Sequence, residues 1–460
     1  MASPRRLRRG DEMKRLFFPV FLLSLLVAHP DASADFEKGL EAYDREDYST
    51  ALQEWEPLAE QGNAIAQTNL GDMYRLGKGV TQDYKEAIKW YRLAAEQEDA
   101  FAQTKLGLMY SNGLGIPQDY REAVRWLRLA AEKGYAAAQV NLGLLYADGL
   151  GVPQDYRKAL KWYQLAAEQG DVKTQFYLGV MYYEGRNVPH DYKEAIKWFR
   201  LAAGQGFVSA RYNLGQMYRQ GQGVPQDYKE AAKWYRLAAE QGEARARYSL
   251  GLLYAKGLGV PQESEEAIKW YNLAAEQGHA DSQHNLGVIY RDGQGVPQDY
   301  RESVRWFRLA AEQGLAHAQS NLGAMYDNGR GVPLDEKEAV RWFRLAAEQG
   351  LALAQYNLGW MYDNGQGVPQ DDKEAVEWYQ RAAEQGYAGA QTSLGAMYGE
   401  GEGIPQDNIS AHMWWNIAAS QGDITSRKNL DVVEKKMTPA EISEAKKRAR
   451  EWKERHGGQD

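Results

Sequence analysis

The chain has 460 residues, no cysteine and a net charge of −8 at neutral pH. The lack of cysteine excludes a disulfide framework, and the acidic balance argues against nucleic-acid binding, which usually leaves a basic footprint. A globular chain of this length would be expected to divide into roughly three domains of about 150 residues, but an internal repeat replaces that division.

Residues 1–34 have the pattern of an export signal. A basic pair precedes the apolar run LFFPVFLLSLLVA (16–28), and the small residues A-S-A (32–34) suit cleavage before Asp35. The apolar run is too short to span a bilayer, for which about 20 residues are needed. This pattern predicts a periplasmic or secreted protein with no transmembrane segment after cleavage. Met13 is an alternative start of the chain, which leaves open whether the residues before it are translated.

Ten units of 36 residues follow one another from Asn69 to Lys428 without an insertion or a deletion. A period between 20 and 50 residues is typical of a solenoid, in which each unit buries its apolar face only by stacking on its neighbours. Residues 35–68 resemble a shortened further unit with a shorter turn between its helices. The sequence therefore predicts an all-α solenoid of about eleven helix-turn-helix repeats, with the full repeats at 69–428.

Each unit predicts two helices joined by a glycine-rich turn. The first helix carries A-Q-x-N-L-G-x-M-Y, as in residues 138–146, and places Leu142 and Gly143 on its buried side. It ends at a pair of glycines such as Gly149 and Gly151, which tolerate positive φ, and the following proline prevents the helix from continuing.

The second helix begins with Asp as the N-cap and Glu three residues later, a capping-box pattern. The pattern is seen at Asp119/Glu122, Asp191/Glu194, Asp227/Glu230 and Asp299/Glu302. A tryptophan recurs ten times from Trp90 to Trp414, and we interpret it as core between helices rather than a cofactor ladder, because an aromatic at helical spacing favours packing. The helix ends at a glycine such as Gly134.

Two positions depart from the pattern of glycines. Asn187 stands where the fourth unit should have the second glycine of its turn, and asparagine is the non-glycine residue best tolerated in the left-handed region. Glu98 replaces the glycine that ends the second helix, which predicts a strained or remodelled turn between the first two full repeats.

Residues 429–460 predict a C-terminal cap. Asn429 and Leu430 begin another first helix that lacks the glycine, and T-P-A-E at 438–441 is a second capping box with proline in the first helical position. That box starts a helix to about Arg455, whose basic outer face suits the soluble end of a solenoid.

The sequence predicts no catalytic residue, no cofactor and no metal site. The recurring G-x-G lacks the third glycine of a dinucleotide-binding loop, and S-x-x-K at 443–446 lacks the companion motifs of a penicillin-binding site. Stacking would bring His284, His317 and Asp281 near one another, but a metal site needs three or four supported ligands. We interpret these three residues as solvated.

The blocks N-L-G-x-M-Y, G-x-G-V-P-Q-D-Y, E-A-x-x-W-Y/F and A-A-E-Q-G resemble the Sel-one-like repeat family, a relative of the tetratricopeptide repeat, over about nine-tenths of the chain after residue 34. The resemblance implies a right-handed α/α superhelix that serves as an adaptor or scaffold without chemistry of its own, and exported bacterial members also carry a signal peptide. A cysteine-rich branch, for which β-lactamase-like activity has been proposed, has a disulfide in each repeat. This chain has none, so that activity is not carried over.

In tetratricopeptide-like geometry the first helix lines the concave groove, and residues at i, i+3, i+7 and i+10 share that face. Aromatic, arginine and histidine residues occupy these positions: Phe176, Tyr183, Tyr212, Arg219, Arg245, Tyr248, His284, Arg291, Tyr356 and Trp360. Aromatic and arginine side chains are enriched at binding hot spots, so they predict a groove for a protein or peptide. The alternative is that these side chains pack between adjacent first helices.

We therefore expect a non-enzymatic interaction scaffold of the cell envelope, a monomer or weak oligomer. One alternative is a regulatory factor for envelope polysaccharide or for host interaction, which rests on analogy alone. A hydrolase of β-lactam or cell-wall type is the least favoured, because no nucleophile stands out.

Overall fold

The computed structural model describes residues 30–456, which contain helices and turns and no strand. The predicted signal segment and the alternative start at Met13 lie outside these residues, apart from the beginning of the first described helix at Pro30. No helix in the described region is both long and apolar enough to cross a membrane. The chain divides into two compact units, residues 30–190 and 191–456, between α10 and α11.

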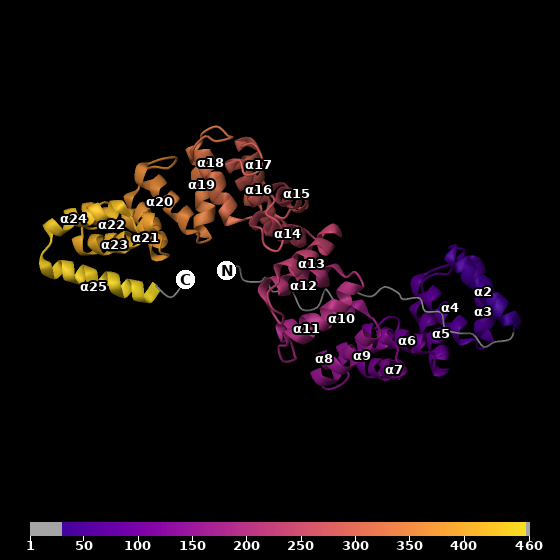
Figure 1. Ribbon diagram of the computed structural model, residues 1–460. Coiled ribbons are helices and arrows are strands. Elements are labelled where there is room, and N and C mark those ends of the chain that lie inside the picture. Colours follow the sequence, from indigo (N-terminus) through magenta and orange to yellow (C-terminus); the bar gives the residue numbers. More distant parts are fainter. Residues whose placement is uncertain (1–29, 457–460) are drawn as a thin grey trace. The chain divides into compact units, whose positions relative to one another are not determined.

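Figure 1 shows consecutive helices lying side by side within each unit, and the contacts follow the order of the chain. The first unit contains α2 (Pro30–Asp44), α3 (Tyr48–Glu60), α4 (Ala64–Leu76), α5 (Tyr84–Glu96), α6 (Ala100–Asn112), α7 (Tyr120–Glu132), α8 (Ala136–Asp148), α9 (Tyr156–Glu168) and α10 (Val172–Glu184). The second unit begins with α11 (Tyr192–Gly204), α12 (Val208–Gln220), α13 (Tyr228–Glu240), α14 (Ala244–Lys256), α15 (Ser264–Ala275), α16 (Ala280–Asp292), α17 (Tyr300–Glu312) and α18 (Ala316–Asp327). It continues with α19 (Glu336–Glu348), α20 (Ala352–Asn364), α21 (Asp372–Glu384), α22 (Ala388–Glu400), α23 (Asn408–Ser420), α24 (Ile424–Val433), the 3-10 turn η1 (Glu434–Lys436) and α25 (Pro439–His456).

The even-numbered helices from α4 to α22 are the first helices of the repeats, and the odd-numbered helices from α5 to α23 are the second helices. Within each unit, a first helix packs on the second helix that follows it, and a second helix packs on the next first helix. The predicted all-α solenoid of stacked helix pairs is confirmed in both units. The shortened N-terminal pair is α2 and α3, joined by residues 45–47.

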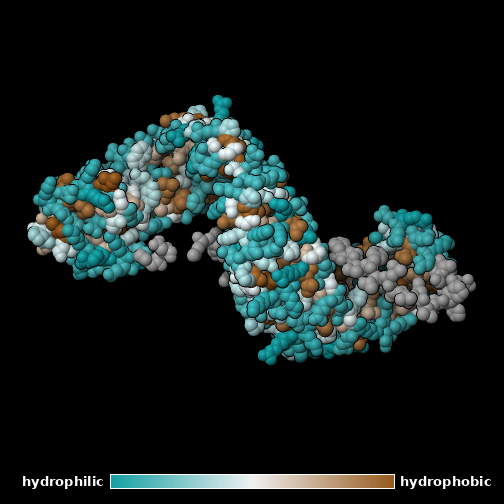
Figure 2. All heavy atoms as spheres, viewed as in Figure 1, coloured by the Kyte–Doolittle hydropathy of each residue, from teal (hydrophilic) through white to brown (hydrophobic). Residues whose placement is uncertain are grey.

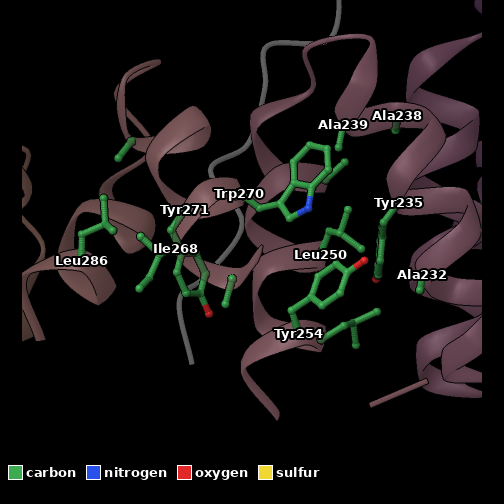
Figure 3. Close-up of a cluster of buried hydrophobic side chains, with 14 of the residues drawn as sticks. Ala232, Tyr235, Ala238, Ala239, Leu250, Tyr254, Ile268, Trp270, Tyr271 and Leu286 are labelled. Atoms are coloured by element: carbon green, nitrogen blue, oxygen red, sulfur yellow. The ribbon is translucent and has the colours of Figure 1, made fainter. Parts of the chain in front are cut away.

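In most first helices a glycine lets a ring of the second helix lie against the backbone, and at Gly107 the side chain of Leu127 takes that place. A Cβ atom on Gly143 would lie 2.6 Å from the ring of Tyr163, and one on Gly215 would lie 2.5 Å from the ring of Tyr235. Such distances are shorter than van der Waals contact, so a larger residue would push the two helices apart. The neighbouring leucines, such as Leu142, are fully buried as predicted. Figure 3 shows this kind of core around Leu250, with Tyr235, Tyr254 and Trp270 nearby.

The predicted interhelical turn is confirmed in detail. Gly149 ends α8 in the left-handed region at φ 68°, and Gly151 has φ 71°. The backbone N–H of Asp155 closes the turn by donating to the carbonyl of Tyr146 at 2.9 Å. A Cβ on Gly151 would lie 2.3 Å from the carbonyl oxygen of Tyr120, so the turn lies on the start of the preceding repeat's second helix. Asn187 adopts φ 60°, as the sequence indicated.

The recurring tryptophans are core residues that join consecutive repeats. Eight of the ten are buried, and Trp162 and Trp234 are half-buried. Trp126 belongs to an apolar cluster that joins Ile88 and Tyr91 of the preceding repeat to Leu106 and Met109 of its own first helix. Several of the indole N–H groups are buried and have no hydrogen-bond partner among the described residues: those of Trp90, Trp126, Trp198, Trp234, Trp270 and Trp342. The indoles therefore contribute mainly through apolar contact.

In the capping boxes of the second helices, only the hydrogen bonds to the Asp carboxylate form. The Asp119 carboxylate accepts from the backbone N–H groups of Arg121 at 2.8 Å and Glu122 at 3.1 Å. The reciprocal bond is absent in this part of the structure, because the N–H of Asp119 donates to the carbonyl of Tyr110 instead, at 3.0 Å. Glu122 pairs with Arg125 at 3.2 Å. The predicted Asp cap is confirmed, and the predicted second half of the box is wrong.

The turn at Glu98 is strained and not remodelled. Glu98 has φ 70°, and its N–H donates to the carbonyl of Ala95 at 3.0 Å, just as Gly134 donates to Ala131 in the next repeat. Lys133 donates from its ammonium group to the Glu98 carbonyl at 2.7 Å and pairs with its carboxylate at 3.0 Å.

The last repeat is covered by α24, η1 and α25. Thr438 and Glu441 form a reciprocal capping box, with the Thr438 N–H donating to the Glu441 carboxylate at 2.7 Å and the Glu441 N–H donating to the Thr438 hydroxyl at 3.3 Å. Within α25, Ala449 is fully buried, and the Trp452 ring lies 5.9 Å from that of Trp414. The terminal helix therefore covers apolar surface of α23.

Candidate functional site

The ten residues predicted to bind a partner all lie on first helices. Phe176 and Tyr183 are on α10 in the first unit, and the other eight are on α12, α14, α16 and α20 in the second unit. Nine of the ten are half-buried, and Arg245 is exposed. We call the positions Tyr212, Arg219, Arg245, Tyr248, His284, Arg291, Tyr356 and Trp360 the first-helix face of the second unit.

Rings of the second helices support the tyrosines of the first-helix face. The Tyr212 ring centre lies 5.9 Å from that of Tyr235, and the Tyr248 ring lies 6.0 Å from that of Tyr271. Burial raises the pKa of both Tyr212 and Tyr248, so both hydroxyls are neutral at physiological pH. Each ring therefore packs on one side and leaves part of its surface open.

Successive repeats also touch one another along this face. The Arg245 guanidinium lies 4.6 Å from the Tyr212 ring centre, within range of a cation–π interaction. Arg245 also forms an ion pair with Glu243 at 2.7 Å. The Tyr248 ring lies 4.8 Å from that of His279 at the start of α16. Part of the surface of these side chains therefore packs between repeats, as the alternative interpretation expects.

A polar cluster follows on α16 and α18. The ring nitrogen Nε2 of His284 lies 3.0 Å from the side-chain nitrogen of Asn321, and Arg291 donates to the side-chain oxygen of Asn321 at 3.1 Å. Burial lowers the pKa of His284, which favours the neutral ring. The His317 ring lies 6.2 Å from that of His284 and is exposed. Over residues 35–456, no three His, Asp or Glu side chains gather closely enough to hold a metal ion.

Sequence reasoning missed the charge that accumulates near α20. Asp363 lies on α20 three residues after Trp360, Asp372 is at the start of α21, and Glu402 follows α22. The structure brings the three carboxylates within electrostatic range of one another. A sequence signal existed, because Glu336 and Asp372 replace the tyrosine that begins most second helices.

Two arginines on the first helices were also missed. In most repeats a buried glutamine such as Gln139 donates to the carbonyl of the preceding second helix, here Ala131 at 3.1 Å. Arg211 and Arg247 occupy that position in α12 and α14, and Arg247 donates to the carbonyls of Ala239 and Leu273, both at 3.0 Å. These arginines lie at the carboxyl ends of second helices, where a positive charge is stabilising.

The surface gives no sign of a large apolar patch on the side seen in Figure 2, where hydrophobic residues are scattered among hydrophilic ones. Exposed leucines recur on the second helices, including Leu201, Leu237 and Leu345 at 46%, 39% and 36% exposure. The first-helix face differs from this background because its rings are supported and arginines lie beside them.

Stacked helix pairs with paired glycine turns define the class of tetratricopeptide-like α-solenoids. The Sel1 repeat family matches ten consecutive segments: 64–99, 100–135, 136–171, 172–207, 208–243, 244–279, 280–315, 316–351, 352–387 and 388–423. The chain belongs to the Sel1 repeat family. Proteins of this family are generally interaction scaffolds with protein partners, without catalysis of their own.

Two solved structures are similar to the chain. One is c5321, described as a protective antigen present in uropathogenic Escherichia coli strains that displays an SLR fold; it is 37% identical over 92% of each chain, with a TM-score of 0.82. The other is a Sel1 repeat protein from Oxalobacter formigenes, 33% identical over 75% of this chain and 97% of that one, with a TM-score of 0.55. No curated protein was found to match.

Proposed function

We propose that this protein is a scaffold of the cell envelope that binds a protein or peptide partner along the first-helix face and performs no catalysis. The observation that supports this most directly is the set of half-buried rings on α12, α14 and α20, each supported from below by a ring of a second helix. A ring held on one side loses little conformational entropy when a partner covers the other side, which favours affinity.

The envelope location rests on the export signal predicted within residues 1–34 and is part of the proposal. Cell fractionation of a strain that expresses the full chain tests it. We expect a shortened chain in the periplasm or the medium, beginning at Asp35 by N-terminal sequencing. Retention of the full-length chain in the cytoplasm would contradict it.

Partner capture tests the binding face. Proximity labelling in the native host identifies candidates, and the purified chain is then tested against them with Tyr212→Ala, Tyr248→Ala and Trp360→Ala, singly and together. We expect capture to be lost in the triple variant. The matched control removes apolar surface from second helices instead, with Leu201→Ala, Leu237→Ala and Leu345→Ala, which should leave capture intact.

Thermal unfolding distinguishes binding from packing. The three face variants should each lower the melting temperature only modestly, because these side chains are half-buried. Tyr235→Ala removes a fully buried ring and should cost about 3–5 kcal/mol. If the face variants unfold as early as Tyr235→Ala, the rings are core residues and the proposed face is wrong. Turnover of an envelope substrate by the purified chain would likewise contradict a purely binding role.

A second candidate is a host-facing role, favoured by one comparison. The similar c5321 is described as a protective antigen, and it matches this chain over 92% of both lengths. Binding of the intact chain to host glycoproteins, with the same face variants, tests this role. Recovery of only bacterial envelope proteins would reject it.

A further inference from the structure

Aromatic and acidic side chains meet at one part of the second unit, which we call the acidic aromatic patch: Tyr356, Trp360, Asp363, Asp372 and Glu402. The first three lie on α20 with spacings of four and three residues, so they share one side of that helix. Asp372 is the first residue of α21, and Glu402 lies in the turn after α22.

The rings of the patch are supported from within the fold. The Tyr356 ring centre lies 5.8 Å from that of Tyr379 and 5.2 Å from that of Tyr387. Trp360 is half-buried and packs on the clusters of two consecutive repeats. Leu353 beside them is 43% exposed. The patch thus offers a firm apolar surface that remains partly open.

The carboxylates of the patch have no cationic partner in the described part of the chain: none of the ion pairs within 4.0 Å involves Asp363, Asp372 or Glu402. Their neutral partners are few, since Asp363 accepts from the Tyr379 hydroxyl at 3.1 Å and Asp372 accepts from the Gln370 amide at 3.1 Å. Burial raises the pKa of Asp363, the hydrogen bond from Tyr379 partly opposes this, and the Asp372 charge adds a smaller upward shift. The charges therefore repel one another, which a bound cation would relieve.

The rest of the chain shows which cation such a surface accepts. Elsewhere in the second unit, Arg245 lies over the Tyr212 ring and Arg341 lies over the Trp342 ring, each with its guanidinium carbon 4.6 Å from the ring centre. Each of these arginines also forms an ion pair with a carboxylate. The acidic aromatic patch has the rings and the carboxylates of this arrangement. Among the described residues, no arginine or lysine lies over Tyr356 or Trp360.

We propose that the acidic aromatic patch binds an extended, arginine- or lysine-rich segment of the protein partner. The cationic side chain lies over Trp360 or Tyr356, while Asp363, Asp372 and Glu402 accept its hydrogen bonds. This inference rests on the proposed scaffold function and adds the charge of the segment that is recognised. The first-helix face at α12 and α14 carries arginines instead, so the basic segment is directed to the α20 end of the second unit.

The test uses the full chain and a short, unstructured peptide of alternating arginine and glycine, with affinity measured by calorimetry at low ionic strength. The variant Asp363→Asn/Asp372→Asn/Glu402→Gln should bind about tenfold more weakly, since exposed charge pairs are individually weak but three are removed together. Trp360→Ala should also weaken binding. Added salt should weaken binding to the wild type more than to the triple variant.

A charge-matched control separates the patch from the overall charge of the chain. Glu240→Gln/Glu312→Gln/Glu348→Gln removes three exposed carboxylates from second helices that take part in no ion pair of the described chain. It should bind the peptide as the wild type does. Equal loss in both triple variants would overturn the proposal, and so would Ca²⁺ alone binding at the patch and displacing the peptide, which would make it a cation site.

Partner capture separates this inference from the proposed function. If the captured partner binds the wild type and the Asp363→Asn/Asp372→Asn/Glu402→Gln variant equally, the basic-segment proposal fails while the scaffold function stands. If the wild type captures no partner at all, the scaffold function itself fails. A partner lost only from the patch variant supports both.

Discussion

Glu98 occupies a backbone conformation that glycine adopts in the equivalent turns. Its φ of 70° matches the left-handed turn at Gly134, where φ is 89°, although a side chain at this position is strained. The ion pair with Lys133 lies at the surface, where such pairs contribute little. The turn is therefore a local weak point between the first two full repeats.

We expect Glu98→Gly to stabilise the chain by about 1 kcal/mol, because it removes this strain without changing the hydrogen bonds of the turn. Chemical denaturation of both proteins measures the difference. Gly134→Ala is the matched reverse, because no atom lies within 4 Å of a Cβ there, so only backbone strain is added. A loss of stability in Glu98→Gly would show that the Lys133 contacts outweigh the strain.

The carboxylate of Asp363 should oppose folding at neutral pH. Its pKa is raised in the folded chain, so the folded chain binds the proton more tightly than the unfolded chain does. The destabilisation is present above the folded-state pKa and disappears as the pH falls below it. Asp363→Asn, which keeps an acceptor for Tyr379, should melt above the wild type at neutral pH, and the gap should close in acid.

The carboxylate of Asp155 should have the opposite effect to that of Asp363 and stabilise the fold at neutral pH. Hydrogen bonding from the Lys158 backbone lowers the pKa of its carboxyl, so its stabilising effect is present at neutral pH and is lost as the pH falls through the folded-state pKa. Asp155→Ala should therefore melt below the wild type at neutral pH, with a smaller gap in acid. Melting curves that shift in the same direction for both variants would contradict this assignment.

At the scale of the helix, the two kinds of N-terminus differ in how many hydrogen bonds a side chain makes. Asp119 caps α7 from one side only, whereas Thr438 and Glu441 cap α25 reciprocally. The difference arises because the Asp119 N–H is already used by the carbonyl of Tyr110 across the interhelical turn. Where a second helix has a glutamate at its third residue, as at Glu122, that side chain is thus free to pair with a lysine or arginine on the helix surface.

This difference predicts different costs for three alanine substitutions. Asp119→Ala removes the cap and should cost about 1 kcal/mol. Glu122→Ala removes only a surface ion pair with Arg125 and should cost clearly less. Glu441→Ala should cost more than Glu122→Ala, because it removes a bond to the backbone N–H of Thr438. Denaturant titration ranks the three, and equal losses for both glutamates would contradict the one-sided cap.

The helices, their ends and their buried faces followed from the sequence because they depend on residues within one repeat. Leu142, Gly149 and the recurring tryptophans are of this kind. The half-formed capping box, Arg211 and the neighbours of Asp363 were missed because they depend on contacts between segments of different helices. The sequence predicted which residues of α12 and α14 share the first-helix face. It could not decide between packing and binding, because a half-buried ring is compatible with both roles.

At the scale of the molecule, each repeat contributes to stability mainly through its neighbours. The indole of Trp126 packs in one cluster with Ile88 and Tyr91 of the preceding repeat, and the turn at Gly151 rests on the helix that begins at Tyr120. A nearest-neighbour arrangement of this kind tolerates a change in the number of repeats better than the loss of an end.

Deleting residues 213–248, which make up one whole period, should leave a soluble, helical protein. Removing residues 429–460 should instead uncover Trp414, Trp415 and the fully buried His412, and so promote aggregation. Circular dichroism and size-exclusion chromatography of the two shortened chains measure this. A folded, monodisperse truncation beside an unfolded repeat deletion would refute the nearest-neighbour account.

The unpaired indole N–H groups give the molecule an optical property. Fluorescence from an indole shifts to shorter wavelengths when water and hydrogen-bond acceptors are excluded, as they are around Trp90, Trp126 and Trp342. Every full repeat carries one tryptophan at the equivalent position, so emission reports on each junction between repeats as it opens. Replacing one of these tryptophans by phenylalanine removes the fluorescence emission of a single junction. Comparing the unfolding curves of such variants gives the order in which the junctions separate along the chain.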